Sequence, residues 1–151
     1  MHNNRSRGFT LIELLVVIAI IGVLSAVVLA SLNTARLKGN DASIQSNLST
    51  IQTQAEIYYG NTDNSYGSAV NDGVCTTAGS MFDADVTIKR AIAALEVANG
   101  AGSTASCYTD GVLYAISSPL STDSAKHWCV DNNGTVGVRV AAASGTACPL
   151  N

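Results

Sequence analysis

The chain has 151 residues, with room for one folded domain of about 110 to 120 residues beside a single apolar stretch. Charged residues make up 13% of the sequence, the formal net charge is −3, and no cluster of Lys or Arg follows Lys38. This balance argues against sequence-independent nucleic-acid binding. Ala, Ser, Thr, Asn and Gly dominate outside the apolar stretch. Such a neutral, hydroxyl-rich surface suits packing against copies of the same chain.

The apolar stretch covers residues 14–30 and reads LLVVIAIIGVLSAVVLA. A helix over residues 9–30 would be roughly 33 Å long, which matches the hydrocarbon thickness of a bilayer. Arg5 and Arg7 precede it, so the N-terminal flank should stay cytoplasmic and the remainder should face outward. The sequence therefore predicts a single membrane-spanning helix.

A cleaved signal peptide is the alternative, because Val28, Leu29 and Ala30 resemble a small-residue cleavage site. The apolar run is longer than a usual signal core, and Glu13 interrupts it, which makes that residue a functional hypothesis. The apolar pattern also continues beyond Ala30 at helical spacing, through Leu37, Ile44, Leu48, Ile51, Ala55 and Tyr58. We therefore expect one helix over residues 9–59, with a bend or frayed turn at Gly39 and Asn40.

Residues 7–17, RGFTLIELLVV, resemble the class III leader and N-terminal segment of type IV pilins and of the pseudopilins of type II secretion. The resemblance is specific over about the first 30 residues and loose beyond them. It implies that a prepilin peptidase cuts between Gly8 and Phe9, and that the new amine of Phe9 is methylated. It also implies assembly into a helical filament of identical subunits by inner-membrane pilus machinery. Many relatives have a Pro in the apolar segment; here Gly22 is the only helix-weakening candidate.

Glu13 lies one helical turn after Phe9. A carboxylate inside the bilayer edge is unfavourable, so membrane insertion alone does not explain it. Cleavage would create an amine at Phe9 with a pKa near 8. Glu13 could pair with the Phe9 amine of its own chain. The resemblance implies instead that it pairs with the Phe9 amine of a neighbouring subunit and so sets the axial register of the filament.

Beyond the long helix, residues 60–79 read as an irregular connection rich in Asn, Asp, Ser and Gly. Asp83 or Asp85 can cap a short helix that ends near Ala98 and Gly100. Antiparallel strands are predicted at residues 112–116, 126–130 and 135–140, bounded by turn residues. Asn133 and Gly134 indicate a hairpin between the last two strands. Either a two-residue turn or a five-residue loop fits, so the register stays open.

The four cysteines, Cys75, Cys107, Cys129 and Cys148, contain no CxxC pair, which argues against zinc or thioredoxin-type chemistry. Their even number beyond an anchor predicts two disulfides formed in an oxidising compartment, with three pairings open. The resemblance suggests Cys129 with Cys148, which leaves Cys75 with Cys107.

No residue pattern points to catalysis. His2 would leave with the leader, and His127 is expected to be a surface residue in a strand. Asp123, Asp131 and Asn132 are oxygen ligands that could hold Ca²⁺, but their spacing fits turns better than a calcium loop. We therefore expect neither a metal nor a cofactor.

Together these features predict an α+β protein: a leader at residues 1–8, a transmembrane and filament-core helix at 9–30, and a soluble pilin-like domain at 31–151. The expected function is that of a type IV pilus-like subunit, anchored in the cytoplasmic membrane before assembly and extracellular after it. A pseudopilin of a secretion or DNA-uptake machine, in a periplasmic fibre, is the alternative. A binding module released by cleavage before Ser31 is a third hypothesis, from a different class.

Overall fold

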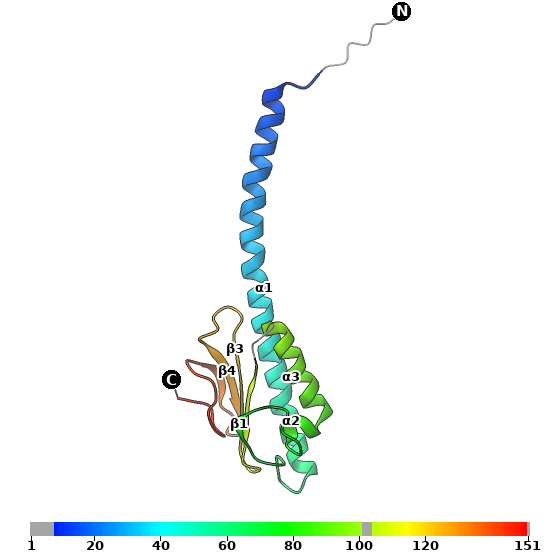
Figure 1. Ribbon diagram of the computed structural model, residues 1–151, viewed down its shortest axis with the longest axis vertical. Helices are drawn as coiled ribbons and strands as arrows, with labels where there is room; N and C mark the ends of the chain where they lie inside the picture. Colours follow the sequence, from blue (N-terminus) through cyan, green and yellow to red (C-terminus); the bar gives the residue numbers. More distant parts are fainter. Residues whose placement is uncertain (1–7, 101–103, 151) are drawn as a thin grey trace, which may run out of the picture. The chain divides into compact units, whose positions relative to one another are not determined.

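The computed structural model describes residues 8–100 and 104–150. The long helix α1, Leu11–Asn61, confirms the helix expected from the periodicity (Figure 1). The chain divides into two compact units, Met1–Arg36 and Leu37–Asn151. The frayed turn predicted at Gly39 and Asn40 as the alternative to a bend is wrong, because both residues are helical.

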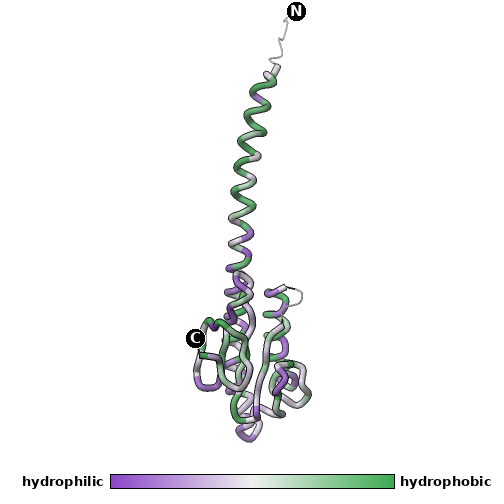
Figure 2. The backbone as a smooth tube through the Cα atoms, turned by 60° about the vertical axis from the view of Figure 1, so that its left-hand side comes forward, coloured by the Kyte–Doolittle hydropathy of each residue, from purple (hydrophilic) through white to green (hydrophobic). Residues whose placement is uncertain are grey.

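The second half of α1 forms one wall of the folded unit. Its buried apolar residues recur every three or four positions, at Ile44, Leu48, Ile51 and Ala55. This spacing places them on one side of a helix. Figure 2 shows the corresponding change along α1, from nearly continuous apolar sequence to alternating character.

Five strands form one antiparallel sheet in the order β1-β2-β3-β4-β5. Their bounds are β1 Val70–Gly73, β2 Ser106–Thr109, β3 Tyr114–Pro119, β4 His127–Asp131 and β5 Val136–Arg139. The predicted antiparallel sheet is confirmed, but β1 and β2 were not expected. Each has only four residues, and β1 reads VNDG within the segment interpreted as irregular. Pairing to a neighbouring strand, rather than β propensity, makes these segments extended.

Strand β3 lies further along the chain than predicted. Val112 and Leu113 belong to the preceding turn, because the Asp110 carboxylate accepts hydrogen bonds from both of their N–H groups, at 2.9 and 2.7 Å. Ser117 and Ser118, interpreted as the end of the strand, are inside it and are buried. A carboxylate that holds two backbone donors therefore decides where the strand begins.

The structure has the five-residue β4–β5 connection rather than the two-residue turn. Val130 faces Val136, and Trp128 faces Val138. The Asp131 carboxylate accepts hydrogen bonds from the N–H groups of Asn133 and Thr135, at 3.0 and 2.9 Å. These bonds organise the wider loop from inside.

Two helices follow β1: α2, Met81–Ala84, which was not predicted, and α3, Val86–Asn99. Asp85 caps α3 by accepting hydrogen bonds from Thr87 N and Ile88 N at 2.8 and 2.9 Å. Asp83 instead forms an ion pair with Lys89 at 2.6 Å. The helix ends at Gly100, where φ is 90°, a conformation that glycine adopts without strain. The expected cap and stop of this helix are confirmed.

The sheet separates two apolar clusters. On one face, residues of α1 and α3 pack against inward-facing strand residues such as Cys107, Tyr114, Ile116 and Val130. On the other face, Ala115 and Cys129 pack against Ala143 and Cys148 of the C-terminal segment. The C-terminal segment thus supplies the cover that a second layer of helices would otherwise provide.

Candidate assembly segment and its supporting structure

The segment that resembles a prepilin cleavage site lies directly before α1. Phe9 is 89% exposed, and a side chain added at Gly8 would meet no atom within 4 Å. Gly8 therefore has no packing role in the described structure. Three residues of the expected leader, His2, Arg5 and Arg7, lie outside the described residues.

Glu13 and Thr10 form a reciprocal cap at the start of α1. The Glu13 carboxylate accepts hydrogen bonds from the N–H and the hydroxyl of Thr10, at 2.9 and 2.8 Å, and the Thr10 hydroxyl accepts one from Glu13 N at 3.2 Å. This is the capping-box arrangement, in which a Thr at the helix start pairs with a Glu three positions later. The sequence interpretation missed it, although the Thr-x-x-Glu spacing was a sufficient signal.

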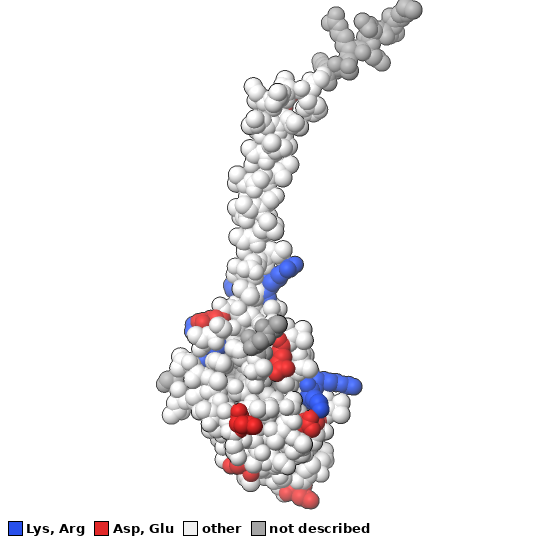
Figure 3. All heavy atoms as spheres, viewed as in Figure 1, with Lys and Arg blue, Asp and Glu red and all other residues white. Residues whose placement is uncertain are grey.

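The segment after Glu13 is apolar on all sides and has no internal cover. Its most hydrophobic 18-residue window is entirely unburied, and α1 is the one helix in the described residues that is long and apolar enough to cross a membrane. Figure 3 shows this surface free of charged side chains, in agreement with the sequence between Glu13 and Arg36. The helix continues through Gly22, which lies in open space.

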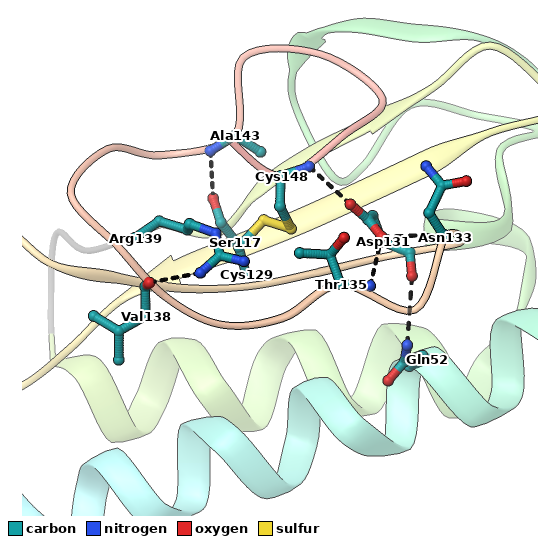
Figure 4. The surroundings of a disulfide bond; sticks show 10 residues. All are labelled: Gln52, Ser117, Cys129, Asp131, Asn133, Thr135, Val138, Arg139, Ala143 and Cys148. Atoms are coloured by element: carbon teal, nitrogen blue, oxygen red, sulfur yellow. Dashed lines mark hydrogen bonds between the residues drawn. A yellow bond between two sulfur atoms is a disulfide. The ribbon is translucent and has the colours of Figure 1, made fainter. Parts of the chain in front are cut away.

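Two disulfides stabilise the folded unit. Cys75, in the loop after β1, is bonded to Cys107 of β2. Cys129 of β4 is bonded to Cys148 in the C-terminal segment (Figure 4). This is the pairing that the resemblance suggested, with the second bridge anchoring the C-terminal segment on the outer face of the sheet.

Asp131 joins the C-terminal disulfide to the β4–β5 loop. Its second carboxylate oxygen accepts a hydrogen bond from Cys148 N at 3.0 Å, beside the two bonds from the loop (Figure 4). Its backbone carbonyl accepts a longer bond from the Gln52 side chain of α1, at 3.4 Å. Asp131 is 1% exposed, and a buried carboxylate needs hydrogen-bond donors. The three backbone N–H groups supply them. The sequence reading treated this residue as an ordinary turn former.

The oxygen ligands considered for calcium do not converge. Asp131 is committed to backbone N–H groups, Asp123 pairs with Lys126 at 3.4 Å, and Asn132 accepts a bond from Tyr114 N at 3.4 Å. Among residues 8–100 and 104–150, no group of three His, Cys, Asp or Glu side chains is arranged to hold a metal ion.

His127 begins β4, as expected of a strand residue, and is half-buried. Its Nδ1 atom is buried and has no hydrogen-bond partner among the described residues. This partial burial lowers the pKa of the imidazole below its usual value, because desolvation disfavours the charged form. Opposite it on β5 lies Arg139.

Comparison with known proteins gives a family model that matches this segment and similarity to two pilus proteins. The family model for the prokaryotic N-terminal methylation motif matches residues 3–29. The chain is 30% identical to the type IV major pilin protein PilA of Myxococcus xanthus over 80 residues, which cover 53% of this chain and 36% of that protein. It is 45% identical to the type IV wide pilus major component PilA4 of Thermus thermophilus over 53 residues, covering 35% of this chain and 40% of that protein.

The aligned regions thus span about two fifths of the length of these relatives. No solved structure matches the chain significantly. Both relatives are named as pilus components, which are structural proteins rather than enzymes. These matches show that the chain carries the prokaryotic N-terminal methylation motif and is similar to type IV pilins.

Proposed function

We propose that this chain is the structural subunit of a type IV pilus-like surface filament. The observation that carries the proposal is the uncovered first half of α1, in which the most apolar window has no buried residue. So much exposed apolar surface needs an apolar environment throughout the life of the protein. The bilayer supplies that environment to the precursor, and the same segments of other copies supply it in the filament.

In this proposal, residues 1–8 are a leader, residues 9–30 are the membrane-spanning and filament-core segment, and residues 31–151 carry the soluble domain. A prepilin peptidase cuts between Gly8 and Phe9 and the Phe9 amine is methylated, after which inner-membrane assembly machinery extracts the subunit. The two disulfides support export to an oxidising compartment, because such bonds persist there.

Glu13 is the proposed assembly residue. Its carboxylate lies on the first turn of an apolar helix, where an unpaired charge is costly once water is excluded. A Phe9 amine from a neighbouring subunit would supply the opposite charge. In the uncleaved chain the Thr10 cap satisfies the same carboxylate, so the precursor enters the membrane with this group already hydrogen-bonded.

The relatives are named as major pilus components, which favours a pilus over a pseudopilus as the proposed assembly. Mass spectrometry of the mature protein, combined with shearing of intact cells, tests the proposal. We expect a protein that begins with a methylated Phe9 and is recovered in the sheared surface fraction. Mature protein that starts at Ser31 would contradict the family-type processing, and correctly processed protein confined to the periplasm would favour the pseudopilin instead.

A further inference from the structure

Asp41 is the one buried residue in the first turns of α1 within the folded unit, before the apolar core begins at Ile44. It is 8% exposed, and no Lys or Arg pairs with it in the described structure. A carboxylate at such a position needs other donors, because an unsatisfied buried charge is strongly unfavourable.

Those donors come from the connection between β3 and β4, about 80 residues further along the chain. Asp41 Oδ1 accepts hydrogen bonds from the N–H groups of Ser121 and Thr122, at 2.6 and 3.3 Å. Asp41 Oδ2 accepts one from the Thr122 hydroxyl. We call these three bonds the Asp41 latch.

The end of β3 and the same loop are both held by polar contacts to the end of α3. The Asn99 side-chain amide donates to the Ser118 hydroxyl at 2.9 Å and to the Pro119 carbonyl at 2.7 Å. The Ser121 hydroxyl donates to the Ala98 carbonyl at 3.2 Å. Three elements therefore meet at this end of the folded unit through hydrogen bonds.

Apolar packing at this end is sparse. Leu37 is only half-buried, and Leu120 is the last buried residue before an exposed stretch over residues 122–126. By contrast, the rest of α1 in the folded unit contributes fully buried residues from Ile44 to Ala55. Regions with few buried apolar contacts open locally at lower free energy than the core.

We propose that Asp41 is a releasable latch: it holds the helical stretch 37–43 against the β3–β4 loop, and its release opens this end while the core stays folded. The closed latch determines how much of α1 the folded unit covers. The open latch shortens the stretch of α1 that the folded unit covers. The proposal concerns the folded unit alone and does not depend on the function proposed above.

Hydrogen–deuterium exchange on the full chain in detergent micelles tests the latch. In Asp41→Ala we expect exchange about tenfold faster or more in peptides covering residues 37–43 and 119–126, since hydrogen bonds to a charged group are lost. Peptides covering residues 44–58 and 127–131 should exchange as in the wild type. Asp123→Ala is the matched control, because it removes an exposed acid of the same loop whose hydrogen bond and ion pair, to Ala125 and Lys126, lie within that loop.

Thr122→Val removes only the hydroxyl donor and should give a smaller increase confined to the same two regions. It also serves as the test if Asp41→Ala does not fold. Faster exchange across the whole folded unit would make Asp41 a general stability residue and overturn the latch. Unchanged exchange in residues 37–43 and 119–126 would overturn it as well.

Discussion

Glu13 has two candidate partners at the start of α1, and the structure shows one of them. Thr10 binds its carboxylate through both the backbone and the hydroxyl. The proposed second partner, the Phe9 amine, would exist only after cleavage. A helix cap explains why a Glu is tolerated at this position, whereas pairing between subunits would explain a requirement for it during assembly.

Two variants separate these roles. Thr10→Ala removes the capping hydroxyl and should cost about 0.5–2 kcal/mol of local helix stability, while leaving the carboxylate in place. We expect it to form filaments. Glu13→Ala should be inserted and trimmed normally but be largely absent from the sheared surface fraction. Equal filament yields from the two variants, measured by immunoblotting of membrane and sheared fractions, would reduce Glu13 to a capping residue.

His127 should make the stability of the folded unit depend on pH. Because burial lowers its pKa, the folded state binds a proton less readily than the unfolded chain. Above about pH 6.5 the imidazole is neutral in both the folded and the unfolded state, so the shift costs no stability. Below that value the unfolded chain binds a proton more readily than the folded state, so the free energy of unfolding decreases as the pH falls toward the lowered pKa.

The measurement is the difference in thermal midpoint between pH 7.5 and pH 5.5. We expect this difference to be smaller in His127→Gln than in the wild-type chain. His2→Gln in the uncleaved chain is the control, because it removes the other histidine and leaves the sequence of β4 unchanged. If His127→Gln kept the full wild-type pH dependence, other groups would account for it.

At the scale of elements, the β4–β5 loop and the C-terminal segment are joined by Asp131. Its carboxylate accepts three backbone N–H bonds, two from the loop and one from Cys148. The Cys129–Cys148 bridge makes a covalent link between the same two regions. The outer face of the sheet therefore has a polar and a covalent attachment side by side.

Asp131→Ala should lower the free energy of unfolding by about 3 kcal/mol or more, because three backbone donors lose their acceptor. Asp131→Asn keeps one acceptor oxygen and should lose less. Asp72→Ala is the matched control: Asp72 also accepts a backbone bond, from Val74 N at 3.0 Å, but at an exposed position near the end of β1. Urea unfolding of the full chain in detergent gives the comparison, and equal losses at Asp131 and Asp72 would contradict this account.

At the scale of the whole molecule, the proposed maturation from membrane precursor to filament subunit depends on cleavage between Gly8 and Phe9. Gly8 precedes α1 with open space around it, so a substitution there should leave the fold unchanged. Gly8→Arg should block access of the backbone to the peptidase and leave full-length precursor in the membrane. Gly8→Ala adds a single methyl group and should be processed. Anti-peptide detection of the leader distinguishes the two, and normal trimming of Gly8→Arg would place the cut elsewhere.

The sequence by itself determined the features that depend on neighbours along the chain. The apolar run, the basic residues that precede it and the helical spacing from Leu37 to Ala55 are local sequence patterns. The cap of α3 was also local, although the sequence left it open between Asp83 and Asp85. Such local patterns specify helices and anchoring segments directly. Even the missed Thr10 and Glu13 cap was readable from its spacing.

Only the tertiary structure decided what depends on residues far apart in sequence. Strands β1 and β2 are short and polar, and exist because each pairs with a neighbour in the sheet. The β4–β5 register follows from the buried carboxylate of Asp131, and the burial of Asp41 follows from a loop about 80 residues away. Local propensity carries no information about such contacts, because their free energy comes from pairing and burial that the folded chain alone provides.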